Sequence, residues 1–181
     1  MTIITVADTE TTGFRSDKGH RIIEFCAAMF DLESRQHLRT YTFRINPLRD
    51  IPADATRVHG IYLEDLVDAP TWEKTAPLVN KILTKTDLFV AHNCEFDATF
   101  IGEELLRVGI APPDVPMFCT MKNGRWATPN GKNPKLGELC WALQVEYDPA
   151  KAHAAEYDVQ KTAECLWRGL DARLYSLPTL H

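Results

Sequence analysis

Short apolar runs separated by polar turns dominate the first quarter of the chain. Residues 3–7 form an apolar run typical of a buried strand, and a polar connection with two glycines leads to a second run at 21–32. A turn-like stretch at 33–36 precedes a third segment, 37–45, which carries several bulky or apolar side chains. This pattern predicts three successive strands joined as a β-meander.

Helical patterns alternate with short strands in the rest of the chain. One clear helix follows the strand-like residues 86–93 and is ended by Gly109 and a Pro-Pro pair soon after it. Residues 120–135 are rich in Gly, Asn and Pro and are predicted to be largely loop. The predicted helical segments are 63–70, 71–83, 94–110, 136–145 and 156–174, and the further predicted strands are 86–93 and 115–119.

This order of elements, three meander strands and then alternating helices and strands, predicts an α/β fold with a mixed sheet. No internal repeat, low-complexity tract or interdomain linker interrupts the 181 residues. We therefore expect a single domain spanning 1–181, which is long enough for a sizeable core.

Composition and charge narrow the class of protein without indicating an activity. A hydrophobic fraction of 45% and a charged fraction of 25% are ordinary for a soluble globular protein, and no apolar run approaches the roughly 20 residues that span a bilayer. The net charge of −5 argues against an undirected, basic nucleic-acid coat. The N-terminus lacks the features of a signal peptide and the five scattered cysteines form no CxxC pair, so a cytoplasmic protein with reduced thiols is expected.

Two carboxylates follow directly on the first apolar run. Asp8 and Glu10 are two residues apart on an extended chain, so their side chains leave the same face, with Cα atoms about 6–7 Å apart. Both carboxylates are then close enough to reach one cation. The alternative is a polar strand end in which Asp8 and the neighbouring threonines complete a turn.

Two further acids lie near the starts of predicted helices. Asp97 shares a helical face with Ile101 and Leu105, so it heads a buried stripe just after a strand end. Asp158 lies early in the last helix, and His153 points toward it only from the preceding loop or the first turn, because five helical residues rotate the chain by about 140°. The ordinary alternatives are acids that complement a helix dipole and a solvated loop histidine.

Four acids that converge on one pocket repel one another unless cations compensate their charge. Two divalent ions would balance four carboxylates, and such oxygen ligands with open water positions suit Mg²⁺ or Mn²⁺ rather than zinc. A paired site of this kind serves in-line phosphoryl transfer, in which one ion activates a water and the other stabilises the leaving oxygen. His153 would be the general base for that water, because imidazole titrates near neutral pH.

The segments "DTETTG", "VHGI", "HNCEFD" and "HAAEYD" occur in this order along the chain. In order and spacing they resemble the DEDDh branch of the DnaQ-like 3′→5′ exonucleases, and the resemblance runs from about Ile3 to Leu170. It implies a ribonuclease-H-like fold with a mixed five-stranded sheet and helices on both faces. It also implies hydrolysis of phosphodiester bonds at free 3′ ends of nucleic acid, with release of 5′-mononucleotides; DNA with single-stranded or frayed ends is the favoured substrate.

The resemblance assigns roles to individual residues. The metal-site acids, which would hold two Mg²⁺ or Mn²⁺ ions, correspond to Asp8, Glu10, Asp97 and Asp158, and the general base, in H-x4-D spacing, corresponds to His153. The residues that would approach or pack against the 3′-terminal nucleotide are Thr11, Thr12, Val58, His59, Asn93 and Phe96. Apolar and aromatic side chains beside a metal site can stack on bases without reading sequence. Phe96 is also suited to the core, and residues 58–62 have neither a helical nor a strand-like pattern.

The stretch from Lys122 to Lys135 carries four basic residues and no acid, so it is the best candidate in the sequence to guide a phosphate backbone; a solvated loop is the alternative. Many members of the resembled family have Asp-Thr after the fifth strand where this chain has Cys119-Thr120, a difference that we interpret as structural. The chain ends soon after the last helix, so a stand-alone nuclease is expected rather than one tethered to a polymerase. Some members are homodimers, and the sequence is compatible with a homodimer.

Other functions fit parts of the sequence. An aspartyl-phosphatase would use Asp8 as nucleophile, but its chemistry usually requires a second Asp at position 10, a lysine and a later acid pair, and it gives His153 no role. A non-catalytic nucleic-acid-binding module on the same fold should have lost metal-site acids, and this chain has them all. Within the exonucleases, an RNA-processing or oligoribonuclease-type enzyme is the alternative.

Overall fold

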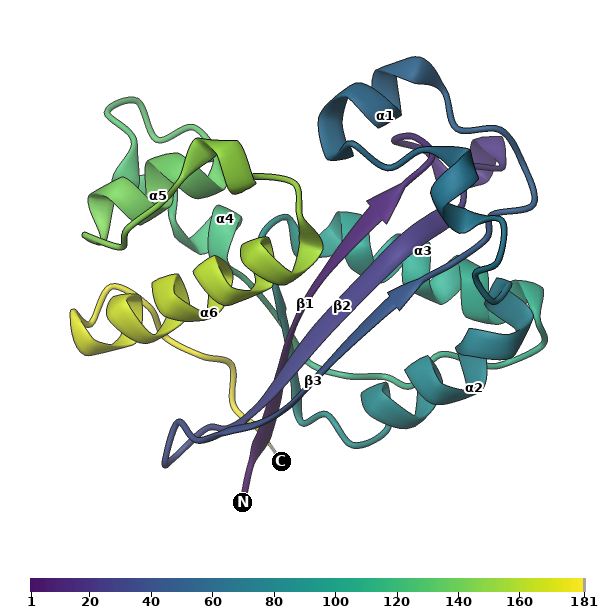
Figure 1. Ribbon diagram of the computed structural model, residues 1–181. Coiled ribbons are helices and arrows are strands. Elements are labelled where there is room, and N and C mark those ends of the chain that lie inside the picture. Colours follow the sequence, from purple (N-terminus) through teal and green to yellow (C-terminus); the bar gives the residue numbers. More distant parts are fainter. Residues whose placement is uncertain (181) are drawn as a thin grey trace.

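The computed structural model describes residues 1–180 and contains a mixed sheet of five strands in the order β3-β2-β1-β4-β5 (Figure 1). The strands are β1 (Ile3–Thr11), β2 (Ile22–Asp31), β3 (His37–Arg44), β4 (Leu88–Ala91) and β5 (Met117–Cys119). The first three pair antiparallel as the predicted meander, whereas β4 and β5 run parallel to β1. The sheet therefore combines a local hairpin system with strands that return through helical crossovers, as expected of an α/β fold.

Helices cover both faces of the sheet, with α6 on one side and α2 and α3 on the other (Figure 1). The helices are α1 (Ala53–His59), α2 (Trp72–Leu83), α3 (Cys94–Arg107), α4 (Thr120–Asn123), α5 (Leu136–Ala142) and α6 (Ala155–Asp171). Short 3₁₀ turns are η1 (Ser16–Lys18), η2 (Leu63–Leu66), η3 (Arg125–Ala127) and η4 (Pro149–Lys151). Within residues 1–180, no helix combines the length and the apolar character needed to cross a membrane.

The alternation of side chains along β1 feeds two separate apolar cores. Ile4 and Val6 pack with Val159 and Leu166 of α6 on one face, and Ala7 packs with the α2 and α3 side on the other. Burial of both faces explains why the run "IITVA" is continuous rather than alternating. The prediction of a mixed five-stranded sheet with helices on both faces is confirmed.

One local prediction was wrong, and one helix end differs. Residues 58–62 were expected to have no regular structure, but Val58 and His59 form the last turn of α1, which ends where Gly60 adopts a left-handed conformation with φ of 69°. Residues 120–135 are largely loop, as predicted, but they begin with the short elements α4 and η3. Both helices are too short to show an apolar periodicity, so their sequences carry no clear pattern.

The last helix ends at Asp171, three residues before its predicted end. The chain then turns back, with Arg173 in the left-handed region, and the Leu174 N–H donates to the carbonyl oxygen of Gly169 at 2.8 Å. This turn brings the ring of Tyr175 against Gly169, where a Cβ atom would lie only 2.2 Å from the ring. Only a glycine at that position leaves room for the C-terminal segment to fold back.

Candidate functional site

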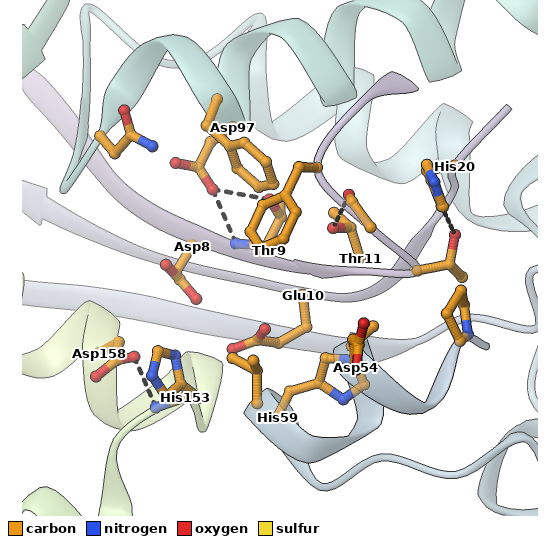
Figure 2. A pocket seen from close by; sticks show the side chains of 18 of the residues that line it. Asp8, Thr9, Glu10, Thr11, His20, Asp54, His59, Asp97, His153 and Asp158 are labelled. Atoms are coloured by element: carbon orange, nitrogen blue, oxygen red, sulfur yellow. Dashed lines mark hydrogen bonds between the residues drawn. The ribbon is translucent and has the colours of Figure 1, made fainter. Parts of the chain in front are cut away.

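A pocket of about 520 Å³ lies at the C-terminal end of β1, between α1, α3 and the start of α6 (Figures 1 and 2). Its size is typical of a site for a small molecule or one nucleotide. All eleven residues singled out from the sequence line it: Asp8, Glu10, Thr11, Thr12, Val58, His59, Asn93, Phe96, Asp97, His153 and Asp158. The tertiary structure thus brings together positions that are up to 150 residues apart in the chain.

The end of β1 supplies the first two acids. Asp8 and Glu10 follow Ile4 and Val6 on the face of β1 that packs against α6, as their spacing predicts. The pairing of β1 with β2 shifts register between Glu10 and Thr11, which marks a β-bulge. Bulges redirect side chains and are frequent beside active sites, and here the bulge separates the acids from the residues that follow them.

Helix α3 supplies the third acid from the opposite face of the sheet. Its N-cap, Asn93, has a left-handed φ of 77°, and Asp97 follows in the first turn and is only 2% exposed. The Oδ1 atom of Asp97 accepts hydrogen bonds from Thr9 N–H at 2.9 Å and Thr9 Oγ1 at 2.8 Å. These two bonds fix the carboxylate against β1, as Figure 2 shows.

The fourth acid and the histidine come from the start of α6. His153 lies in the loop before the helix with a left-handed φ of 64°, and its backbone N–H donates to Oδ2 of Asp158 at 2.9 Å. The sequence predicts that His153 and Asp158 can point together only if His153 lies in the loop before the helix or in its first turn. The structure places His153 in that loop. The other carboxylate oxygen, Oδ1 of Asp158, is buried without a hydrogen-bond partner.

Burial and mutual repulsion destabilise the charged forms of these acids. Burial, followed by the charges of neighbouring acids, raises the pKa of Asp8 well above its ordinary range and that of Glu10 to about 9. Burial raises the pKa of Asp97 to about 7, although the two hydrogen bonds from Thr9 oppose the shift. Burial also raises the pKa of Asp158. Within residues 1–180, no lysine or arginine forms an ion pair with any of the four acids.

The donor set fits divalent metal ions. Glu10, His153 and Asp158 each place one ligand atom within 4.8 Å of the others, and Asp8 and Asp97 line the same pocket. The unpartnered Oδ1 of Asp158 is an available ligand, and a cation would remove the repulsion among the acids. Carboxylate oxygens are the ligands that hard cations such as Mg²⁺ and Mn²⁺ prefer.

The remaining predicted residues form the wall beyond the acids. Thr11 donates through Oγ1 to the carbonyl oxygen of Gly13 at 2.7 Å, which stabilises the turn after β1. Val58 and His59 belong to α1, and Phe96 belongs to α3, where it contacts Phe100 at a ring-centroid distance of 4.9 Å. Phe96 therefore lines the pocket and also packs on the core, and its contact with a terminal base stays a prediction.

The structure adds eight residues to the pocket that sequence reasoning missed. They are Thr9, Gly13, Phe14, His20, Pro52, Asp54, Ala55 and His92. Thr9 and Gly13 lie within the "DTETTG" segment, Phe14 follows it directly, and His92 is the first residue of "HNCEFD", so membership of or adjacency to those motifs was a usable indication. His20 and Asp54 belong to a loop and a short helix with no motif of their own, and only the fold places them here.

The basic stretch 122–135 does not line this pocket. Two of its four cations are engaged locally, since Lys122 pairs with Glu95 and Lys132 with Glu138. Arg125 donates to the carbonyl oxygen of Gly131 at 2.6 Å. The sequence prediction that this stretch guides a phosphate backbone therefore remains a prediction, with less free positive charge than the sequence suggested.

Cys119 holds the position where many relatives were expected to carry an aspartate. Its Sγ atom accepts the backbone N–H groups of Cys94 and Lys122, each at 3.4 Å, and so links the start of α3 to the start of α4. Cys119 does not line the pocket. Its contacts agree with the structural role that we assigned to this position.

Comparison with known proteins places these features in a family. The model of the exonuclease family RNase_T matches residues 5–166. The chain is 33% identical over 157 residues to the 3′-5′ exonuclease DinG of Bacillus subtilis (strain 168), covering 87% of this chain and 16% of that protein. It is 32% identical over 163 residues to the DNA polymerase III subunit epsilon of Rickettsia felis, covering 88% of this chain and 70% of that protein. The chain thus spans about a sixth of DinG and rather more than two thirds of the epsilon subunit.

Solved structures show the same fold. Exonuclease I superposes with a TM-score of 0.83 at 20% sequence identity, over 96% of this chain and 42% of that one. Exonuclease X, solved with a 5′-overhanging duplex DNA, superposes with a TM-score of 0.70 at 23% identity, over 96% of this chain and 95% of that one. The ribonuclease-H-like architecture expected from the sequence is therefore confirmed, and the chain belongs to the DnaQ-like family of 3′→5′ exonucleases.

Proposed function

We propose that this protein is a metal-dependent 3′→5′ exonuclease that removes 5′-mononucleotides from single-stranded or frayed 3′ ends, with DNA favoured over RNA. The observation that carries the proposal is the convergence of four acids and His153, from β1, α3 and the start of α6, in one pocket. An aspartyl-phosphatase is disfavoured because Asp8, among the described residues, shares its pocket with four other acids and with no lysine.

The roles of the residues follow from their chemistry and positions. Asp8, Glu10, Asp97 and Asp158 would hold two Mg²⁺ or Mn²⁺ ions, which when bound supply an activated water and stabilise the leaving oxygen. His153 accepts the proton of the attacking water at a ring nitrogen. Asp158 holds the His153 backbone in place through its Oδ2 atom, so one residue serves both as ligand and as support for the base.

Nucleotide binding is assigned to the wall beyond the acids. The backbone around Thr11 and Thr12 approaches the 3′-terminal nucleotide, and the apolar side chains of Val58 and Phe96, together with His59, pack against its base. Asn93 contributes a polar group between the wall and the metal end. DNA is favoured because exonuclease I of E. coli was solved with a dT13 oligonucleotide and exonuclease X with duplex DNA.

The direct test is a nuclease assay on 5′-labelled oligonucleotides. Matched single-stranded DNA, single-stranded RNA, blunt duplex DNA and a dinucleotide are incubated with Mg²⁺, with Mn²⁺ and with EDTA. We expect stepwise shortening from the 3′ end of single-stranded DNA with metal and none in EDTA. Absence of shortening with either metal would falsify the proposal, and faster shortening of RNA or of the dinucleotide would assign the protein to the exoribonucleases.

Association with a polymerase lies outside the proposal. The expectation of a stand-alone nuclease rested on where the sequence stops, and proteins named as DNA polymerase III epsilon subunits stand among its relatives. Analytical ultracentrifugation of the purified chain would measure whether it forms the homodimer that the sequence allows.

A further inference from the structure

The pocket has a second polar end, opposite the acids and His153, at which His20 lies (Figure 2). His20 comes from the connection between β1 and β2, and it has no role among the four acids or the general base. A role for His20 in binding substrate rests on the proposed exonuclease function. If the scissile phosphate lies at the acids, the nucleoside on its 3′ side extends along Thr11 and Thr12 toward this end.

The hydrogen bonds of Thr12 determine which nitrogen of His20 carries a proton. Thr12 is fully buried, and its Oγ1 atom accepts the backbone N–H of Arg21 at 3.0 Å. Its own hydroxyl proton then has one acceptor among the described residues, Nδ1 of His20 at 3.1 Å. In the neutral imidazole one nitrogen accepts and the other donates. Because Nδ1 accepts from Thr12, Nε2 carries the proton, and in the protonated ring both nitrogens carry one. Nε2 of His20 is a donor in either state.

This donor is free to bind a ligand. Within residues 1–180, Nε2 of His20 forms no hydrogen bond with the protein. The atom is also absent from the buried side-chain atoms that lack a partner, which belong to His59, Trp72, Glu104 and Asp158. It is therefore accessible from the pocket that the residue lines.

The surrounding structure holds the ring in position. A Cβ atom at Gly13 would lie 2.4–2.7 Å from three atoms of the His20 ring, so the ring packs directly on the glycine backbone. Its Nδ1 atom hydrogen-bonds to the buried Thr12, and the next residue, Arg21, donates from Nε to Glu104 of α3 at 2.7 Å, which ties the loop to that helix. A ring held by the glycine backbone and by Thr12 loses little freedom when it binds a ligand, which favours a positioning role.

We propose that His20 binds the base of the 3′-terminal nucleotide by donating a hydrogen bond from Nε2. The lining of the same pocket also includes Phe14, Pro52 and Val58, which suit the flat apolar faces of a base. Each of the four bases carries hydrogen-bond acceptors on its edges, whereas the positions of donors differ among them. A single donor therefore suits an enzyme that must accept every terminal base in turn.

Two substitutions separate this role from the support that His20 gives to Thr12. In His20→Asn the amide group replaces Nδ1, which retains the Thr12 contact and removes the donor in the pocket. In His20→Gln the amide group reaches the position of Nε2, which restores the donor and lacks the Thr12 contact. Each variant is assayed on single-stranded DNA that ends in thymidine or in its difluorotoluene isostere, which has the same shape but only very weak acceptors.

We expect the wild-type protein to prefer thymidine by about fivefold in kcat/KM, the value of one hydrogen bond. The preference should vanish in His20→Asn and return in His20→Gln. Equal losses on both substrates in His20→Asn, or an undiminished preference, would show that His20 only supports the loop and would overturn the inference. If the wild-type protein degraded neither substrate, the proposed function itself would fail, which is a distinguishable result.

Discussion

Helix α3 carries two buried carboxylates, seven residues apart, in opposite electrostatic settings. Within the described part of the chain, Asp97 shares a pocket with Asp8, Glu10 and Asp158 but with no lysine or arginine, and burial raises its pKa to about 7. Glu104, 1% exposed, accepts through Oε1 from Arg21 Nε at 2.7 Å and from the Ile22 N–H at 3.2 Å, and pairs with Arg107 at 3.4 Å. Two arginines therefore compensate the negative charge of Glu104, whereas Asp97 lies among acids that no arginine or lysine of residues 1–180 compensates.

The difference distinguishes an acid that stabilises the fold from one whose setting agrees with the proposed metal site. Glu104 joins α3 to the β1–β2 connection and so supports the loop that carries Thr12 and His20. Asp97 and its neighbours make the metal-free protein less stable, because four acids within one pocket repel one another. Perturbed pKa values of this kind gather at functional sites, which agrees with the proposed binding of metal ions by this cluster.

Substitution of Asp97 by Asn should have the largest effect on activity. The amide keeps an acceptor for Thr9 but removes a charged metal ligand, and the loss of several kcal/mol of metal-based stabilisation should slow turnover by at least about 10⁴-fold. Single-turnover assays with Mn²⁺ would measure it. Glu104→Gln is the matched control on the same helix and should keep most of its activity. Equal activities of the two variants would contradict the contrast between these carboxylates.

His153→Ala should slow turnover by about 10²–10⁴-fold, because the attacking water loses its proton acceptor. The affinity for DNA, measured by fluorescence anisotropy with Ca²⁺, should change little. The control is His37→Ala, an exposed histidine on β3 that contacts Thr40 outside the pocket. An unaffected rate in His153→Ala would remove that residue from the proton transfer.

Glu104→Gln should lower the free energy of unfolding by about 2–3 kcal/mol, because it leaves two partly buried arginines without their acid. Asp97→Asn should leave the metal-free stability unchanged or raise it, since it relieves repulsion. Urea denaturation in EDTA measures both. Glu95→Gln, which removes the exposed partner of Lys122, serves as a control with no measurable loss. A stability loss in Asp97→Asn as large as that in Glu104→Gln would be evidence against the distinction.

The pH dependence of the metal-free protein should show the smallest effect. The pKa of Glu10 is about 9 and that of Asp97 about 7, both above their ordinary values. The folded state therefore binds protons that the unfolded chain has released, and stability falls as pH rises through these values. In EDTA, lowering the pH from 8.5 to 6.5 should therefore raise the free energy of unfolding.

Saturating Mg²⁺ or Mn²⁺ should stabilise the protein more at pH 8.5 than at pH 6.5, because metal competes with the bound protons. Below pH 6.5 the gain per pH unit should become smaller, since burial lowers the pKa of His92 to about 4 and the unfolded chain then binds a proton there that the folded chain does not. Thermal unfolding across pH, with and without metal, measures both trends. The gain on lowering the pH should shrink in Asp97→Asn; a wild-type slope in that variant would assign the effect to other groups.

The strands and the long helices could be predicted because their patterns are local. The continuous run in β1 and the apolar face of α6 follow from burial alone, and Asp97 and Asp158 could be placed near helix starts for the same reason. The short helix α1 could not be predicted, because seven residues give too few turns for a periodicity. The ion-pair partners of Lys122 and Lys132 could not be predicted either, since each lysine pairs with an acid outside the basic stretch.

The sequence by itself determined the order of the elements, the residue types at the site and the family to which the chain belongs. These properties depend on side-chain periodicity and on short motifs, which are complete within a few neighbouring residues. Only the tertiary structure decided that Asp97 approaches from one face of the sheet and Asp158 from the other, and that His20 closes the far end of the pocket. Such distances depend on how segments far apart in the chain pack across the sheet, and no local pattern encodes them.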